Sequence, residues 1–477
     1  MKIKLEEYNQ KYHQGGKFID KFQEGIKILP FDSRNASAFG KRCGLQGTTG
    51  EFFRLWIDDG TTPIEDFENS AVIPVIGYLK DIKMMPDFQI PQFIRMMKDI
   101  MLVNGHLNIT DSSFLKYIPL MPNDERIQSK ERNMYKDGQR KLANFLYSML
   151  SDDMQSAPES GSKDLFSKII QESLTPFGGN DNEKKQRDYY IIPYIRQSFE
   201  KDLKWLLSLD ESVKVKYIHL LLHFYACYAV TQATVRLKNK CDDFDSAPAP
   251  FYFILNSEKA SVNHDAVIRG WSSQIPKMTL DRLYGKLQAL DIMNSTLGSN
   301  IGFYSDVIKK LEETPFEENR DACYNLLNSY QQDKRNALSG RSSEKHILDA
   351  FGEIDVNISS YEEFAHKLER LCMGLQSPSY ISRMRKKVID LLSVRFLQNR
   401  KRSGYVLVLD NEMLIFLIAL FSKGKKTKLE DLYKLFNSYG IYFNRGSRLA
   451  IEEYLIKLNL LDRKSDSGEA QYVTVIL

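Results

Sequence analysis

The sequence predicts a mostly α-helical protein with a mixed α/β N-terminal domain, a central helical domain and a C-terminal winged helix-turn-helix. Apolar residues recur at intervals of three and four through the middle of the chain, which is typical of amphipathic helices. Glycine-rich turns and short apolar runs precede this part, and strand-like runs follow helical patterns at the end. The expected parts are a mixed α/β domain at 1–150, a polar loop or linker region at 151–187, a helical domain with a basic end at 188–402 and a winged-helix domain at 403–477.

Two strands and one helix are expected in the N-terminal domain. The short apolar runs at 51–57 and 71–78 suit strands. Residues 90–105 suit a helix, because Pro91 fits its first turn and Gly105 fits the position after its last residue. The polar segments that follow, at 151–162 and 177–187, are rich in Gly, Ser, Pro or charge and predict surface loops.

The central domain is expected to be built around a buried helix. Residues 217–230 are the most apolar stretch of the chain, but they contain two histidines and are shorter than a bilayer-spanning helix of about 20 residues. This helix is predicted to end near Lys240, and a second series of helices is predicted to start near Pro276. Residues 248–255, rich in proline and aromatic residues, predict a strand or a packed loop between them.

The C-terminal part combines three helical patterns with strand-like runs. A strand is predicted at 405–409, a helix at 411–421, and a second helix at 429–439 that ends at Gly440. The third helix is predicted to start near Ser447, as its N-cap, and to run to Leu458.

A hairpin is expected to complete this part. Its predicted strands are 460–464 and 471–476, with Gly468 in the turn. Three helices followed by a two-stranded hairpin is the order of a winged helix-turn-helix.

Composition excludes several classes of protein. The formal net charge is only +4, from 66 Lys and Arg against 62 Asp and Glu, so any nucleic-acid site must be a local patch. The five cysteines are scattered and form no C-x-x-C pair, which argues against a disulfide framework or a zinc finger. The first residues lack the apolar centre of a secretory signal. These features predict a cytoplasmic protein with no membrane association.

The sequence gives no support for catalysis, a cofactor or a metal. The glycine-rich segment 40–53 lacks the Gly-Lys-Ser/Thr end of a phosphate-binding loop, so an ordinary glycine turn is expected there. His219 and His223 are spaced as two ligands on one helix face, but Leu220 stands where a zinc protease has glutamate, which favours a core or interface role. We find no metal-dependent nuclease pattern of an acidic residue followed by Glu-x-Lys or Asp-x-Lys on a credible strand. A non-catalytic protein is therefore expected.

Basic residues near the C-terminus predict a contact with double-stranded DNA. Segment 383–402 carries eight cations and one acid, a density that suits several phosphate contacts or a solvated helix face. In the third helix of the predicted winged unit two arginines suit DNA, whereas Glu452 and Glu453 oppose it, so DNA contact and subunit docking both stay open. The candidate DNA-binding residues are Arg383, Arg385, Lys386, Lys387, Arg395, Arg400, Lys401, Arg402, Lys425, Lys426, Arg445, Arg448, Arg463 and Lys464.

The end of the chain carries a distinctive sequence. Residues 459–473 read Asn-Leu-Leu-Asp-Arg-Lys-Ser-Asp-Ser-Gly-Glu-Ala-Gln-Tyr-Val, after Gly-Ile-Tyr-Phe-Asn at 440–444 and the predicted strand 405–409. Together these segments resemble DptG, also called DndG, a family that forms the middle component of the bacterial DNA phosphorothioation-dependent restriction complex. The resemblance covers residues 405–477, and the upstream region agrees in length and helical character.

The resemblance implies a cytoplasmic subunit that acts with an ATPase partner, DptF, and a translocase-like partner, DptH. Together they would attack foreign DNA that lacks the sulfur modification of the host genome. It transfers no catalytic residue to this chain. The expected function is that of a non-catalytic DNA-binding and scaffolding subunit in anti-phage defence. The alternatives are a kleisin-like docking subunit without DNA contact and a cryptic nuclease whose metal site is assembled from distant acids.

Overall fold

The computed structural model describes most of the chain. The described residues are 2–19, 27–31, 39, 44–57, 63, 71–83, 86–103, 106–107, 111–120, 127–154, 187–238, 247–258, 264–298, 302–339, 347–348, 356–463, 471–475 and 477. Most of the predicted loop region at 151–187, and the hairpin turn with Gly468, lie outside them.

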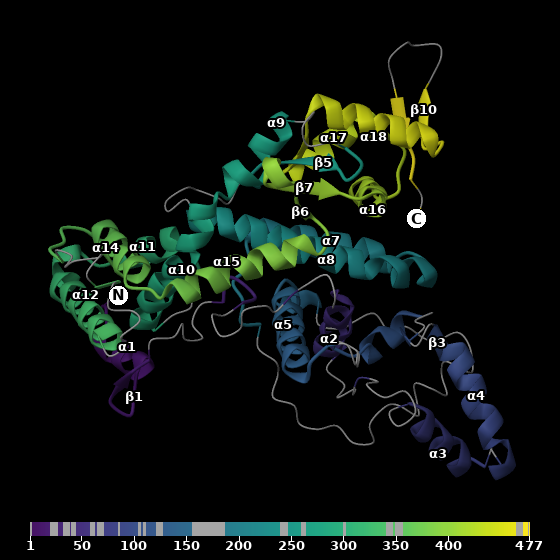
Figure 1. Ribbon diagram of the computed structural model, residues 1–477, viewed down its shortest axis with the longest axis horizontal. Helices are drawn as coiled ribbons and strands as arrows, with labels where there is room; N and C mark the ends of the chain where they lie inside the picture. Colours follow the sequence, from purple (N-terminus) through teal and green to yellow (C-terminus); the bar gives the residue numbers. More distant parts are fainter. Residues whose placement is uncertain are drawn as a thin grey trace.

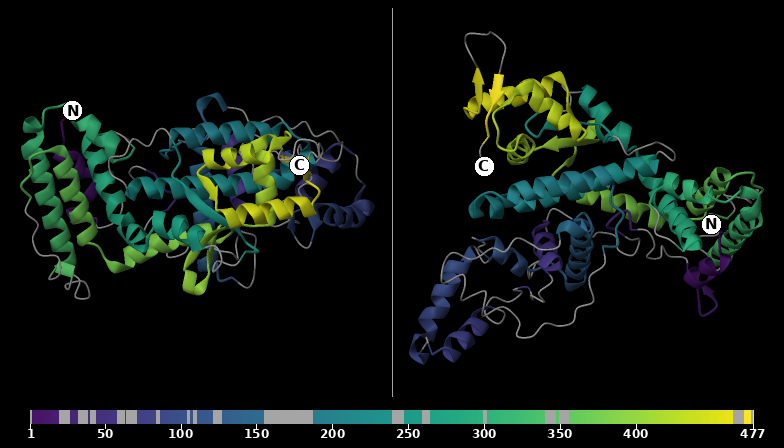
Figure 2. Two further views of the ribbon diagram at one scale, coloured as in Figure 1. Left: turned by 90° about the horizontal axis from the view of Figure 1, so that it is seen from above. Right: turned by 180° about the vertical axis from the view of Figure 1, so that it is seen from behind.

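The described part is mostly helical, with a few small sheets, as the sequence predicts. Three helices run along the long axis of the molecule, and the other elements lie around them (Figure 1). In the view from behind, the C-terminal segment and the helices of the first 150 residues lie on opposite sides of this layer (Figure 2). The three helices are α7 (Pro193–Leu207), α8 (Glu211–Lys238) and α15 (Pro378–Ser393).

Helix α8 lies at the centre of the fold. Its residues from Leu220 to Leu237 are all buried, so the helix has no polar face to turn toward water. It contacts elements on several sides, among them α5, α10, α15 and α16. The prediction of a buried core helix at 217–230 is confirmed. Its end at Lys238 and the start of the next long helix at Lys277 lie within three residues of the predicted positions.

Five helices form one end of the molecule. The most extensive contacts in this cluster join α10 to α14, and α10 also packs against α15 of the central layer. A buried ion pair, Lys286 to Glu369 at 2.9 Å, links α10 to α14. The helices are α1 (Leu5–Tyr12), α10 (Lys277–Leu297), α11 (Tyr304–Leu311), α12 (Phe316–Ser339) and α14 (Tyr361–Gly374).

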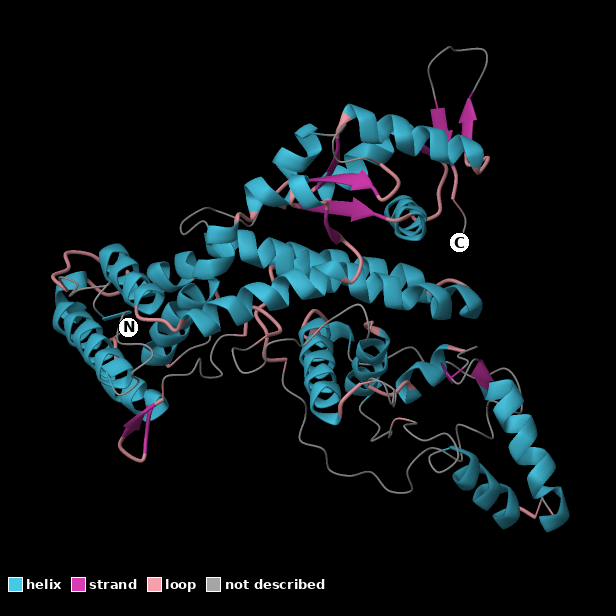
Figure 3. Ribbon diagram, in the orientation of Figure 1, coloured by secondary structure: helices cyan, strands magenta, loops and turns pink. Residues whose placement is uncertain are grey.

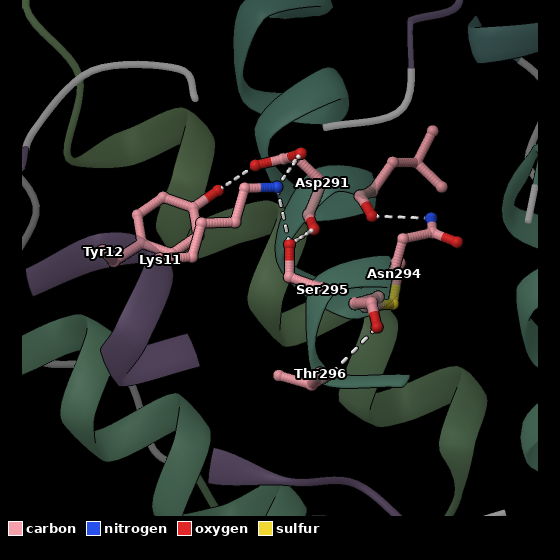
Figure 4. Close-up of polar contacts among 8 residues, drawn as sticks. Lys11, Tyr12, Asp291, Asn294, Ser295 and Thr296 are labelled. Carbon is pink, nitrogen blue, oxygen red and sulfur yellow. Dashed lines mark hydrogen bonds and ion pairs between the residues drawn. The ribbon is translucent and has the colours of Figure 1, made fainter. Parts of the chain in front are cut away.

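The N-terminal helix α1 packs on α10, far from it in sequence. The buried carboxylate of Asp291 accepts a hydrogen bond from the Tyr12 hydroxyl and forms an ion pair with Lys11 Nζ at 2.7 Å, and Lys11 also donates to Ser295 (Figure 4). Burial raises the pKa of Asp291, and the Lys11 ammonium and Tyr12 hydroxyl oppose that shift. Helix α1, at the start of the chain, therefore packs against α10 and is held there by the Asp291 side chain.

The helices of the first 150 residues include both segments that were predicted as strands. Residues 51–57 lie in α2 and residues 73–78 in α3, so those two strand predictions are wrong. The helix predicted at 90–105 is confirmed over Ile90–Met101, as α4, but Leu102 and Val103 form a strand instead of continuing it. The helices are α2 (Gln46–Ile57), α3 (Ile73–Asp81), α4 (Ile90–Met101) and α5 (Ser129–Tyr147), with the 3-10 turns η2 (Asp87–Gln89), η3 (Ser112–Tyr117) and η4 (Asp152–Met154).

The described strands in this part of the structure are two residues long. They are the short magenta arrows among the helices of the N-terminal part in Figure 3. They form two small antiparallel pairs. These are β1 (His13–Gln14) with β2 (Lys17–Phe18), and β3 (Leu102–Val103) with β4 (His106–Leu107).

Two glycines of α2 allow this helix to pack closely against a neighbouring segment. A Cβ atom at Gly50 would lie 2.2 Å from the carbonyl oxygen of Ile118, and one at Gly47 would lie 2.9 Å from the carbonyl oxygen of Pro119. The absent side chains thus let α2 lie directly against residues 118–120. The glycine turn that was predicted at 40–53 is wrong for residues 46–53, where glycine permits close packing of a helix.

The C-terminal segment shares a sheet with the central part of the chain. Strand β5 (Phe251–Leu255) pairs in parallel with both β7 (Tyr405–Leu409) and β9 (Ile441–Phe443), and β6 (Leu397–Asn399) pairs with β7. Residues 251–255, predicted as a strand or packed loop, are therefore a central strand. The expected boundary at 402–403 falls between two strands that pair with each other.

The remaining C-terminal elements follow the predicted order. The predictions for 405–409, 411–421 and 429–439 are confirmed, and Gly440 ends the second helix with a φ of +73°. Helix α18 is capped by Asn444, whose side chain accepts from the Ser447 N–H, so Ser447 is not the N-cap. The elements are η7 (Lys401–Ser403), α16 (Asn411–Ser422), β8 (Thr427–Lys428), α17 (Leu429–Ser438), α18 (Arg445–Lys457), β10 (Leu461–Arg463) and β11 (Gln471–Val473), preceded by α9 (His264–Val267) and the π turn η5 (Ile268–Ser272) after β5.

One buried carboxylate joins the C-terminal segment to α7 and α8. Asp202 on α7 accepts hydrogen bonds from Tyr225 of α8 at 2.6 Å and from Tyr439, the C-cap of α17, at 3.0 Å. Its other oxygen pairs with Lys423, the left-handed C-cap of α16. Burial lowers the pKa of Lys423, and Asp202 opposes that shift. We call these four residues the Asp202 cluster.

Replacing Gly50 by alanine should destabilise the fold, because the new methyl group would overlap the Ile118 carbonyl. We expect a loss of about 1–3 kcal/mol in the free energy of unfolding, measured by urea titration. Gly77→Ala is the matched control, since nothing lies within 4 Å of a Cβ at that helical position. It should be neutral or stabilising. Equal losses in the two variants would contradict this explanation of α2.

Removing the charge of Asp202 should weaken the attachment of the C-terminal segment. In Asp202→Asn the Lys423 ammonium loses its counter-ion in a largely buried position, and we expect a loss of about 3 kcal/mol in unfolding free energy. Lys434→Met is the control, because the ion pair of Lys434 with Asp431 is exposed and should leave the urea midpoint unchanged. An unchanged midpoint in both variants would show that the Asp202 cluster does not stabilise this junction.

Candidate functional site

The most deeply engaged cation of the predicted basic segment is structural. Arg395 forms two hydrogen bonds to Asp410, at 2.6 and 2.9 Å, and one to Glu412 at 2.5 Å. Asp410 also caps α16 by accepting from the Met413 N–H. Burial by itself would lower the pKa of Arg395, but the bonds to Asp410 and Glu412 outweigh it and raise that pKa. Its charge is thus used to hold α16.

Four more of the predicted cations have partners within the protein or are buried. Arg385 pairs with Asp281 of α10, and Lys387 is buried. The guanidinium of Arg383 lies 5.5 Å from the centre of the Tyr380 ring. Arg400 donates to the backbone oxygen of Asn256 at 3.0 Å. DNA contact by Arg385, Lys387 and Arg395 stays a prediction, and it is disfavoured because ion pairs hold the two arginines and burial holds Lys387 within the fold.

Three cations of segment 383–402 are exposed: Lys386 on α15, and Lys401 and Arg402 in the η7 turn. In the described part of the structure no carboxylate forms an ion pair with them. Lys401 has a φ of +54°, and Gly404 completes the turn with a φ of +70°. The turn between β6 and β7 therefore presents two adjacent cations to solvent.

The start of α10 contributes two further cations, which sequence reasoning missed. The ion pair between Arg385 and Asp281 brings the first turns of α10 beside α15. Lys277 and Arg282 are exposed there. The start of α10 and α15 lie about a hundred residues apart in sequence. Nothing in the local sequence therefore indicates that they are neighbours in the fold. We call Lys277, Arg282, Lys386, Lys401 and Arg402 the exposed basic set.

The predicted cations of the basic turn and the wing are less available. Lys426 pairs with Asp462 and lies over the Tyr472 ring, whereas Lys425 is exposed. Arg463 lies in β10, and the orientation of its side chain falls outside the description. Lys464 lies outside the described residues.

The exposed face of α18 is partly apolar. Leu449 is 52% exposed and Ile456 is 41% exposed. Arg445 is exposed at the start of the helix, while the guanidinium of Arg448 lies 4.7 Å from the centre of the Tyr433 ring. Glu452 accepts a hydrogen bond from Gln471 at 2.8 Å, which fixes this acid beside the apolar residues. The face is thus less basic than two arginines in the sequence suggest.

His219 and His223 lie near Arg395 and its carboxylate partners Asp410 and Glu412. The structure buries His223, and its Nε2 atom has no hydrogen-bond partner among the described residues. Burial lowers the pKa of His223 to about 3, with a further contribution from Arg395 and opposition from Asp410. Burial also lowers the pKa of His219. Both imidazoles are therefore neutral at neutral pH, with His223 in the core and His219 half-buried.

Three further features bear on other kinds of site. Within the described residues, no group of three or more His, Cys, Asp or Glu side chains is arranged to hold a metal ion. Of the helices in the same part of the chain, none combines the length and apolar character needed to cross a membrane. A small apolar cavity lies between α8 and the sheet, lined by aromatic and aliphatic side chains with the Cys227 thiol among them.

No protein-family model matches the chain, and no curated protein matches it significantly.

Acid should destabilise the protein through His223. Because the folded-state pKa lies near 3 and the unfolded one near 6.5, the stabilisation is complete above about pH 6.5 and is lost as the pH falls toward 3. His223→Gln should remove part of this dependence, on the order of a few kcal/mol between pH 6.5 and 4. Urea titrations at several pH values measure it.

The matched control is His366→Gln, at an exposed position of α14. It should keep the pH dependence of the unmodified chain. If His223→Gln also keeps it in full, His223 is not the group that titrates.

Proposed function

We propose that this chain is a non-catalytic, DNA-contacting scaffold subunit of a phosphorothioation-dependent restriction assembly. The observation that carries the DNA contact is the exposed basic set, whose cations come from α10, α15 and the η7 turn. Solvated cations that form no ion pair within the described structure can release the counterions of DNA phosphates on contact. Cations already paired in the fold gain less, because a phosphate must replace an existing partner.

A winged helix-turn-helix is proposed for residues 403–477. Helices α16, α17 and α18 are followed by the hairpin of β10 and β11, and β8 between the first two helices pairs with β11. This order supports the assignment. Such units contact DNA or other proteins. The exposed Leu449 and Ile456 favour a protein contact for α18.

The other parts of the proposal come from the resemblance. The DptG-like sequence at the end of the chain supports an assembly with an ATPase subunit, DptF, and a translocase-like subunit, DptH. Extensive helical surfaces suit a scaffold. The cryptic-nuclease alternative gains no support from the described acids, which form no metal-binding group.

Reversing the exposed cations should weaken DNA binding. In Lys386→Glu/Lys401→Glu/Arg402→Glu we expect duplex affinity to fall by at least about tenfold at moderate salt, because phosphate contacts become repulsive. The slope of log affinity against log salt concentration should fall by up to about 3. Fluorescence anisotropy with a labelled duplex measures both quantities.

The control is Lys2→Glu/Lys4→Glu/Lys17→Glu, which changes the net charge equally through exposed lysines near the N-terminus. It should retain most of the affinity. Equal losses of duplex affinity in the two variants would show that net charge alone causes the effect. Absence of duplex binding at every salt concentration would refute the DNA role. Co-purification of DptF and DptH with a tagged chain from its native cell tests the assembly separately.

A further inference from the structure

Helix α18 runs along the outer edge of the C-terminal segment (Figure 1). Its buried side is formed by Ser447, Ile451 and Leu455. Four residues on the outer side are spaced by four, three and four positions, which places them on one face of a helix. We call Arg445, Leu449, Glu452 and Ile456 the α18 ridge.

The ridge has the wrong chemistry for reading DNA. Its centre combines the exposed Leu449 and Ile456 with the carboxylate of Glu452, and Glu453 is exposed beside it. A recognition helix in the major groove would bring these acids toward phosphates. Arg448, the second predicted DNA-binding arginine of this helix, stacks on Tyr433 instead of pointing along the ridge. A protein surface is the better partner.

The charges of the ridge are complementary to themselves in an antiparallel arrangement. Arg445 lies one turn before Leu449, and Glu452 lies nearly one turn after it. When a second α18 packs antiparallel across a two-fold axis near Leu449, each Arg445 faces a Glu452 and the two leucines meet at the axis. This is the pattern of an isologous interface, in which one surface pairs with itself.

We propose that the α18 ridge is a self-association surface that pairs two copies of this chain. Leu449 lies at the two-fold axis, and two pairs of Arg445 and Glu452 set the register on either side. One helix face is small beside the roughly 800 Å² per partner of a typical stable interface. The association is therefore weak and reversible in the isolated chain. It is separate from the exposed basic set, so it does not depend on the DNA contact.

Charge reversal tests the pairing directly. Sedimentation of the full chain from about 5 to 200 μM should show a monomer–dimer equilibrium with a dissociation constant in this range. Leu449→Asp should abolish the dimer. Arg445→Glu and Glu452→Arg should each weaken it by at least about tenfold, because like charges then face each other twice.

Mixing the two charge variants should restore dimerisation. In a mixed dimer the carboxylate introduced by Arg445→Glu faces the guanidinium introduced by Glu452→Arg, and the unchanged Glu452 of the first variant faces the unchanged Arg445 of the second. An equimolar mixture should therefore associate at least about tenfold more tightly than either variant alone. Lys457→Glu, on the far flank of α18, is the control and should dimerise like the unmodified chain. Thermal unfolding confirms that each variant is folded.

Three results would overturn the proposal. One is a chain that stays monomeric throughout this concentration range. Another is a dimer that survives Leu449→Asp, which would place the interface elsewhere. The third is a mixture of charge variants that associates no better than its components. Loss of duplex affinity in monomeric Arg445→Glu would indicate that α18 contacts DNA after all. The variant Lys386→Glu/Lys401→Glu/Arg402→Glu should dimerise like the unmodified chain. Failure of the DNA proposal can therefore be distinguished from failure of the dimer proposal.

Discussion

The buried carboxylate of Asp202 determines how the C-terminal segment sits on the rest of the molecule. It receives hydrogen bonds from Tyr225 and Tyr439 and an ion pair from Lys423, so that α7, α8, α16 and the end of α17 meet at one side chain. A buried carboxylate is unfavourable unless donors surround it, and each of these donors comes from a different element. Because hydrogen bonds are directional, these contacts fix both the orientation of the four elements and the distances between them.

Ion pairs also join elements at three other places. Asp291 holds α1 against α10, Glu369 pairs with Lys286 between α10 and α14, and Asp410 binds Arg395 at the start of α16. Since such pairs require excellent geometry to offset desolvation, they favour one arrangement of the helices over others. These pairs also neutralise cations such as Arg395. The surface is therefore less positive than the number of cations in segment 383–402 suggests.

This explains why the candidate site was only partly predictable. Local charge density selected Lys386, Lys401 and Arg402 among its eight cations, and the fold leaves these three exposed. It could not identify the partners of Arg385 and Arg395, since Asp281 and Asp410 reach them through tertiary contacts. It also missed Lys277 and Arg282, which approach α15 only because α10 packs beside it. On α18, two arginines suggested DNA, but folding exposes Leu449 and Ile456 and turns Arg448 onto Tyr433.

Local patterns were enough to predict the mostly helical character of the chain, the central buried helix and the order of the C-terminal elements, because hydrophobic periodicity and caps depend on neighbouring residues. The segments 51–57 and 71–78 were misassigned, since a short apolar run suits a buried helix as well as a strand. Tertiary packing established that β5 joins β7 and β9, that α1 belongs with α10, and which cations reach solvent. Those outcomes depend on contacts between segments far apart in the chain, and no local pattern records them.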